Sequence, residues 1–321
     1  MGTIERVIGY LDKVSQDPLD RWMGPALVDA SNLPPPGDIL PRHDKVLLAD
    51  TYALWFRWFI DGVCNPLRYV HDDTKTIVDV LADTQDRVET FYGSEPEQER
   101  KALARAISTH VMLEVARQRQ IARVNASRAQ RRELIENVLT PRCWMCGFAF
   151  SGAAVQRFMK SDGAPVIKQP DFVDIFRPRG LFARDVTIEV EHKVPVAAGG
   201  GGTDNLALAC GWCNKTKGAK TGVYEASGRP PRVSFTLGAQ VWHELPHPFW
   251  TARLVATRRI CESTTSCGAT ADNAEMFVAP TDYRGSPNPS TLRVYCAQHD
   301  PYANTRFFGR EAARKIWKAR K

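Results

Sequence analysis

Apolar residues recur at helical spacing through most of the first 140 positions. The segments HDKVLLADTYALWFRWFIDGV, which follows a proline-rich linker at 32–41, and TKTIVDVLADTQDRVETFY each predict one helix. Residues 95–139 contain no glycine, and their one proline lies at the start, so they predict one long helix or two helices with a kink. Pro141 ends this stretch. We therefore expect residues 1–140 to form a helical domain.

The pattern changes after residue 140. DVTIEVE alternates apolar and polar residues, which predicts a half-buried strand leading into His192. Residues 151–185 carry several glycines and prolines and predict a loop with one short helix around AAVQRFMK. RVSFTL and TLRVYC predict short strands, and residues 306–321 predict a final helix. The expected fold class is α+β, with a cysteine-rich module at 141–225 and a small zinc-ribbon-like β/α domain at 226–321.

Charge favours a polyanionic partner. Lys plus Arg exceed Asp plus Glu by 43 − 36 = 7, and residues 115–132 hold six arginines and no acid. Arg119 and Arg123 are four residues apart, as are Arg128 and Arg132, so each pair shares a helix face. Such a face could follow a phosphate backbone, or it could simply be a solvated basic surface. Both interpretations remain open.

No membrane segment is expected. The most apolar stretch, residues 52–60, is interrupted by Arg57 and is far too short to cross a bilayer. The first residues mix charged and apolar side chains, which argues against a secretory signal. We therefore expect a cytoplasmic protein whose paired cysteines bind metal rather than form disulfides.

Seven of the eight cysteines fall into two groups with metal-ligand spacing. Cys143, Cys146, Cys210 and Cys213 form two Cys-x-x-Cys pairs, which can close a tetrahedral zinc site. A closed site leaves no ligand position for water, so this zinc would be structural. Cys261, Cys267, Cys296 and His299 predict a second structural zinc, against the alternative of scattered buried cysteines and a surface histidine. About two zinc ions per chain are expected.

Residues suited to phosphodiester hydrolysis lie beside the first group. This reaction needs a base that activates water and positive charge at the phosphorus and the leaving oxygen. His192 could be the base, while Glu191 and Asn214 offer oxygen ligands suited to Mg²⁺ or Mn²⁺. Lys215 and Lys217 are placed to meet phosphate.

The segments EHKVP, GGGGTDNLAL and CGWCNKTKG, taken together, resemble the HNH endonucleases with a ββα-metal fold and a four-cysteine zinc clamp. The resemblance covers about residues 141–220. It implies that His192 is the general base and that Asn205 steadies the loop holding this base. It also implies that Glu191 and Asn214 bind the catalytic Mg²⁺ or Mn²⁺ and that Lys217 matches a lysine of the motif.

Two functions from different classes follow. The first is a metal-dependent HNH endonuclease that hydrolyses DNA, with RNA left open as a substrate; the resemblance implies products with 5′-phosphate and 3′-hydroxyl ends. Its helical domain would contact DNA or a protein partner or regulate the nuclease, and analogy suggests phage or mobile-element defence. The second is a non-catalytic, zinc-stabilised nucleic-acid-binding or scaffold protein, which predicts salt-sensitive binding without cleavage.

Overall fold

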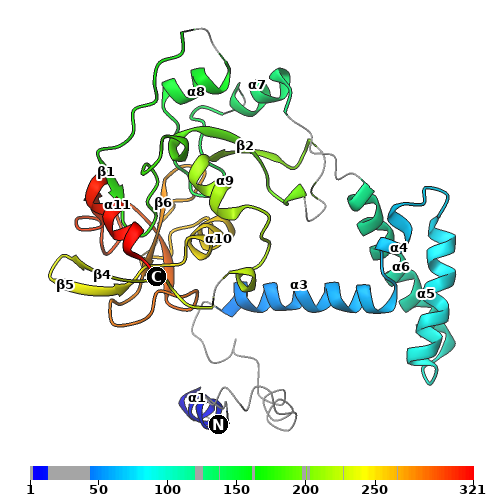
Figure 1. Ribbon diagram of the computed structural model, residues 1–321. Coiled ribbons are helices and arrows are strands. Elements are labelled where there is room, and N and C mark those ends of the chain that lie inside the picture. Colours follow the sequence, from blue (N-terminus) through cyan, green and yellow to red (C-terminus); the bar gives the residue numbers. More distant parts are fainter. Residues whose placement is uncertain are drawn as a thin grey trace.

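The chain has a mixed α+β fold, seen in a computed structural model that describes residues 3–13, 44–119, 126–136, 138–160, 163–196, 200, 203–226, 228–265 and 267–321 (Figure 1). Within these ranges the strands form small antiparallel sheets of two strands each. None of the helices in the described ranges is long and apolar enough to cross a membrane.

The amino-terminal part is helical, as the apolar spacing predicts. Its described helices are α1 (Thr3–Lys13), α3 (Asp44–Val63), α4 (Leu67–Val70), α5 (Ile77–Tyr92), α6 (Glu97–Arg119) and α7 (Arg128–Glu136). The predicted helices at 43–63 and 74–92 are confirmed, and the stretch at 95–139 contains two helices, α6 and α7. Thr76 starts α5 with a capping box, because its backbone N–H donates to Asp79 at 2.8 Å and its hydroxyl accepts from the Val78 N–H.

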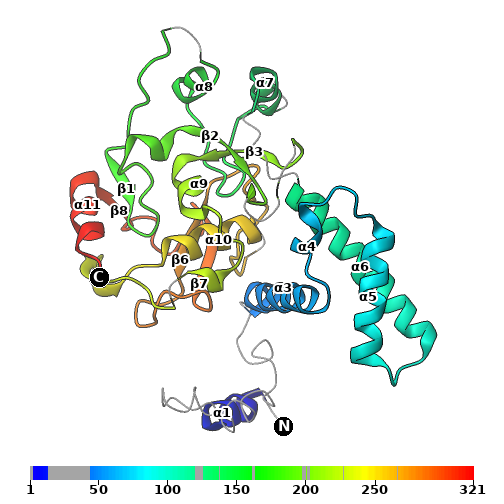
Figure 2. The same ribbon diagram turned by 45° about the vertical axis from the view of Figure 1, so that its right-hand side comes forward.

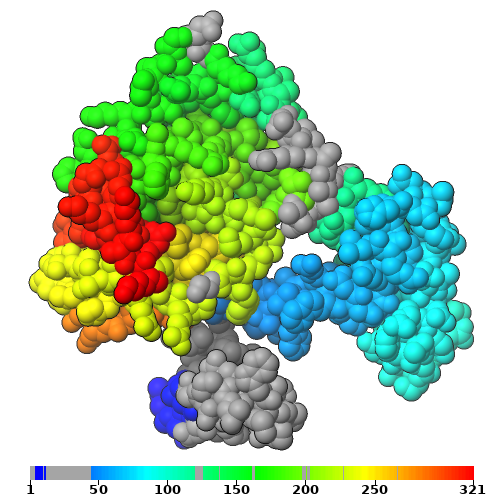
Figure 3. Space-filling view, in the orientation of Figure 1, coloured from blue at the N-terminus to red at the C-terminus, as the bar shows by residue number. Residues whose placement is uncertain are grey.

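Helix α3 joins the helical part to the rest of the molecule. Its carboxyl-terminal end packs with α5 and α6, around buried residues that include Ile60 and Val111. Near its other end, Asp50 is buried and accepts hydrogen bonds from the Val223 backbone N–H at 2.8 Å and from Arg253 at 2.5 Å. Helices α4 to α6 therefore stand to one side of the main body, connected to it through α3 (Figure 3).

The cysteine-rich module contains a β-hairpin followed directly by a helix. Strand β2 (Ile188–His192) pairs antiparallel with β3 (Leu206–Cys210), so that His192 lies opposite Leu206. Helix α9 (Gly211–Lys217) begins at the next residue and contacts both strands (Figure 2). The predicted strand is confirmed, although it begins at Ile188 because a 3-10 turn, η3 (Ala183–Val186), occupies its expected start.

The segment predicted as a loop at 151–185 is more ordered than expected. Its short helix is confirmed as α8 (Gly152–Phe158), capped by the Ser151 hydroxyl, which accepts from the Ala154 N–H. It also contains strand β1 (Phe172–Asp174), which pairs with β8 (Phe307–Gly309) from the far end of the chain. That pairing joins positions about 135 residues apart, so local sequence patterns could not predict it.

The predicted boundary at residue 225 does not separate two cores. Beyond the 3-10 turn η5 (Val223–Glu225), the chain forms β4 (Arg232–Leu237), β5 (Gln240–Glu244), α10 (Pro248–Arg258), β6 (Met276–Pro280), β7 (Leu292–Cys296) and α11 (Arg310–Ala319). One core cluster joins Met145 and Leu208 of the module to Leu254 and Val278 of the carboxyl-terminal part. The hairpin and its seven-residue helix have too little apolar surface to form a core alone.

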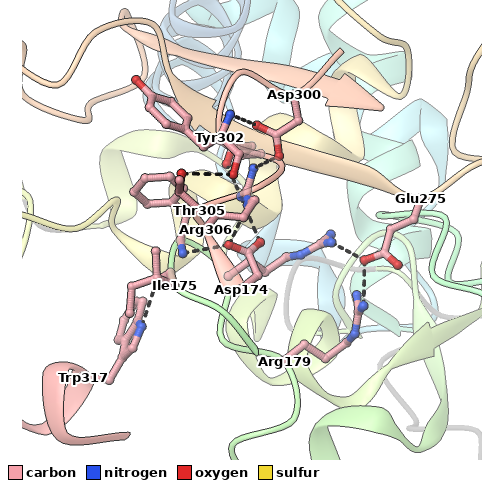
Figure 4. Close-up of polar contacts among 12 residues, drawn as sticks. Asp174, Ile175, Arg179, Glu275, Asp300, Tyr302, Thr305, Arg306 and Trp317 are labelled. Atoms are coloured by element: carbon pink, nitrogen blue, oxygen red, sulfur yellow. Dashed lines mark hydrogen bonds and ion pairs between the residues drawn. The ribbon is translucent and has the colours of Figure 1, made fainter. Parts of the chain in front are cut away.

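A buried arginine network connects the segment at 151–185, an insertion between the two pairs of cysteines, to the carboxyl-terminal part (Figure 4). Arg306 has no solvent exposure and donates to Asp174 at 2.9 Å, to Asp300 at 2.5 Å and to the Val278 carbonyl at 2.7 Å. Both carboxylates are thereby paired, which offsets the cost of burying them.

Candidate functional site: a cysteine-clamped hairpin and helix

The first four cysteines converge on one point. Cys143, Cys146, Cys210 and Cys213 are completely buried, and their sulfur atoms all lie within 4.8 Å of one another. A tetrahedral zinc with Zn–S distances of about 2.3 Å fits sulfur atoms spaced in this way. The turn that carries Cys143 and Cys146 is tied to β3, because the Trp144 N–H donates to the Leu208 carbonyl at 2.8 Å. The group is compatible with a structural zinc that holds β3 and α9 together.

The second predicted group also comes together. The ligand atoms of Cys261, Cys267, Cys296 and His299 lie within 4.8 Å of one another. The His299 Nδ1 atom lies 3.3 Å from the Cys296 sulfur, and its Nε2 atom lies 3.2 Å from the Thr265 hydroxyl. A hydrogen bond to the second ring nitrogen is what usually orients a zinc-binding histidine. Two structural zinc sites are thus compatible with the structure.

Asn205 holds the loop that follows His192. Its Oδ1 atom accepts from the Val194 N–H at 2.9 Å, and its Nδ2 group donates to the carbonyls of Val194 and Gly200 at 2.7 and 2.8 Å. A side chain at Gly200 would collide with the Val194 carbonyl, so the tight approach requires glycine there. These contacts are the ones expected of a residue that steadies this loop.

The acid that contacts Asn214 is Glu189, whereas Glu191 was expected. The Asn214 side chain donates to Glu189 at 2.6 Å, and the same carboxylate accepts from Arg184 at 2.5 and 2.9 Å. Glu189 was missed in the sequence, although strand alternation in DVTIEVE places it on the same face as Glu191. That alternation was the signal that could have found it.

Glu191 takes part in a buried ion pair instead. Its side chain is 4% exposed and accepts hydrogen bonds from Lys217 and from the Trp144 indole, the latter at 3.1 Å. Burial raises the pKa of Glu191, and the bonds from Lys217 and Trp144 oppose that rise. Both carboxylate oxygens of Glu191 are therefore bonded within the protein.

Lys217 is not placed to meet phosphate, contrary to the sequence prediction. It is buried, and its ammonium group donates to Glu191 and to the His192 carbonyl, the latter at 2.9 Å. The reason is that the last turn of α9 lies against β2. Lys215, two residues earlier, is exposed, with its ammonium group 5.2 Å from the centre of the Phe182 ring.

His192 is half-buried at the end of β2. Because the strand extends through it, its side chain projects from the face opposite Glu191 and shares a face with Leu206. A cavity of about 950 Å³ opens beside β3, lined in part by Leu206, Leu208, Lys193 and Arg259. Glu191 and His192 thus lie at the end of β2 on opposite faces, and Glu189 lies three residues before His192 on the face of Glu191.

The predicted arginine face is not continuous. Arg119 donates to the carbonyls of Tyr69 and Asp72 at 2.8 and 2.6 Å, so it closes the turn after α4 rather than facing outward for phosphate. Arg123 lies outside the described residues. Arg128 and Arg132 are exposed on α7, and Arg132 pairs with Glu136 at 3.5 Å.

Comparisons of the chain with protein-family models, with curated proteins and with solved structures found no match. What the protein does must therefore follow from the chemistry of the residues on β2, on α9 and in the loop after β2. These are an acid–amide pair, a half-buried histidine and exposed cations, all on a hairpin and helix clamped by four cysteines.

Proposed function

We propose that the protein is a metal-dependent endonuclease of the HNH type that hydrolyses phosphodiester bonds of DNA. The observation that supports this proposal most is the cysteine-clamped order β2–β3–α9, with Asn205 bonded to the loop next to His192. A zinc-binding module that only needed rigidity would require the cysteines alone. It would not require an asparagine that holds the loop after a histidine at the strand end.

In this proposal His192 is the general base. Imidazole can accept a proton from water near neutral pH, and a base must lie within hydrogen-bond reach of that water. The phosphodiester would lie along β2, within reach of His192 at the end of the strand and of the Glu189–Asn214 pair three residues earlier. Exposed Lys193 and Lys215 would attract the flanking phosphates.

Glu189 and Asn214 would hold a Mg²⁺- or Mn²⁺-type ion. The donor set fits, because a carboxylate and an amide offer the oxygen ligands that these ions prefer. Arg184 and Asn214 now bond both oxygens of Glu189, but the Arg184 side chain is 61% exposed and would move into solvent when an ion binds. When bound, such an ion supplies positive charge for the phosphorus and the leaving oxygen. The expected ligand Glu191 is replaced in this role by Glu189, because Lys217 and Trp144 use its oxygens.

Cleavage assays on plasmid, linear duplex, single-stranded DNA and RNA with Mg²⁺ or Mn²⁺ test the activity. We expect His192→Ala to abolish cleavage while leaving the zinc content and the circular dichroism spectrum unchanged. His243→Ala is the matched control, since this histidine is exposed on β5, and it should cleave like the wild type. Equal cleavage by the wild type and His192→Ala would refute the proposal.

A second pair of variants tests the metal ligands. Glu189→Gln should raise the Mg²⁺ concentration needed for cleavage or abolish cleavage, because a neutral amide binds the ion more weakly. Glu191→Gln should mainly lower stability. If Glu191→Gln raises the Mg²⁺ concentration needed for cleavage or abolishes cleavage, and Glu189→Gln does not, Glu191 is the ligand.

The competing function is a zinc-stabilised nucleic-acid-binding or scaffold protein. The bonds that Glu191 makes to Lys217 and Trp144 favour it, since they are those of a structural carboxylate. This function predicts binding to DNA or RNA that weakens steeply with salt, and no cleavage with any divalent ion. The same assays therefore separate the two functions. In either case α3 is a route by which a DNA or protein partner on the helical part could influence the hairpin.

A further inference from the structure

Two arginines from the insertion lie beside the first cysteine group. Arg179 donates to Glu275 at 2.6 Å (Figure 4). It also donates to the Cys146 sulfur at 3.7 Å. Its guanidinium also lies 3.7 Å from the centre of the Phe148 ring, which fixes the plane of the group. Only 12% of the Arg179 side chain is exposed. Glu275 and the Phe148 ring thus fix the Arg179 guanidinium in contact with Cys146.

Arg177 is buried still more deeply. Its side chain is 1% exposed, and it shares Glu275 with Arg179, donating to the same carboxylate oxygen at 2.5 Å. Its Nε and Nη1 atoms are buried and have no hydrogen-bond partner among the described residues. A buried guanidinium with unused N–H groups is costly unless negative charge lies nearby.

Arg177 and Arg179 share a single carboxylate. Glu275 accepts from both guanidinium groups, while Asp174 and Asp300 both bind Arg306. The three arginines of the network match its three carboxylates in number, but the charge that lies in contact with Cys146 is the positive charge of Arg179. A zinc ion with four thiolates carries a net charge of about −2, and burying that charge is equally unfavourable by itself.

We propose that Arg177 and Arg179 balance the charge of a zinc–tetrathiolate centre and slow the loss of its metal. Glu275 positions both arginines and lies at the start of β6, where the Met276 N–H donates to the Cys146 carbonyl at 2.8 Å. The zinc centre is thus supported by three segments: the first cysteine turn, the insertion and β6. This gives the insertion a role, and it needs no nuclease activity, so it can fail or hold independently of the proposed function.

The test is the rate of zinc release from the zinc-loaded full-length chain into an excess of a chromophoric chelator. We expect Arg179→Met to speed zinc loss from the four-cysteine site by about tenfold or more, the usual effect of removing a hydrogen bond to a metal ligand. The second zinc site is the internal reference, and its release phase is identified because His299→Ala removes it. Arg284→Met is the matched control, since Arg284 is exposed and pairs with Asp282.

Two further measurements separate charge balance from general loosening. Arg179→Lys keeps the charge and should release zinc more slowly than Arg179→Met. In the Co²⁺-substituted protein, Arg179→Met should move the thiolate-to-metal charge-transfer band to lower energy, because the sulfur loses an N–H donor. The proposal is overturned if Arg179→Met releases zinc at the wild-type rate, if it accelerates both sites equally, or if the Lys variant is no slower than the Met variant.

Discussion

Replacing Lys217 with Met tests whether this lysine is structural or binds phosphate. The methionine keeps most of the aliphatic volume and removes the ammonium group that bonds Glu191 and the His192 carbonyl. The side chains of Lys217 and Glu191 are 11% and 4% exposed, so solvent replaces little of the lost interaction. Glu191 would keep its bond from Trp144.

The expected loss of stability is about 3 kcal/mol near neutral pH, because breaking a buried pair leaves an uncompensated charge. The loss should depend on pH. Burial raises the pKa of Glu191, and without Lys217 this folded-state pKa rises further above the unfolded value of about 4.3. A carboxyl group with a raised folded pKa stabilises the fold below the unfolded pKa, and that contribution is lost as pH rises. The penalty of Lys217→Met should therefore grow as the pH rises above the unfolded pKa of the carboxyl group.

Urea unfolding followed by tryptophan fluorescence, at constant zinc, measures this effect. The double variant Glu191→Gln/Lys217→Met should lose clearly less stability than the sum of the single variants, because the unpaired charge is gone. Lys215→Met is the matched control; this exposed lysine should change stability by less than about 0.5 kcal/mol.

One result of this experiment would support the role predicted from the sequence, in which Lys217 contacts phosphate. If Lys217→Met unfolds like the wild type but binds DNA more weakly, with a salt slope reduced by about one unit, Lys217 contacts phosphate. The buried pair would then not describe the working state of the site.

Other regions of the fold make further predictions. Asn205→Ala removes three hydrogen bonds to the loop after His192 and should speed amide exchange at Val194 and Gly200, while the zinc content stays constant. The His247 ring accepts a hydrogen bond from the Phe249 N–H at the start of α10. Burial is the main cause that lowers the pKa of His247, and the positive charges of Lys220 and Arg320 lower this pKa further. Since a neutral imidazole makes this cap, stability should fall by about 1 kcal/mol as the pH drops from the unfolded pKa of about 6.5 through the lower folded pKa, and His247→Asn should remove that fall. Arg119→Ala should lower the thermal stability of the helical part without changing the salt slope of DNA binding, because its partners are backbone carbonyls and Asp73 within the protein.

Local chemistry in the sequence was sufficient for several features. Apolar spacing located α3 and α5, and alternation located β2, because helix and strand periods depend on neighbouring residues. The two Cys-x-x-Cys pairs predicted a convergent group, since a tetrahedral zinc limits which spacings can share one ion.

Only the tertiary structure decided which long side chains meet. Glu189 and Glu191 share one face of β2, so alternation could not tell which would contact Asn214 and which Lys217. That choice depends on how α9 lies across the hairpin. Arg119 belongs to a basic run that predicted contact with phosphate. Because it lies at the end of α6, its guanidinium instead donates to the carbonyls of Tyr69 and Asp72 after α4. Periodicity assigns a residue to a face, but the position of the next element decides its partner.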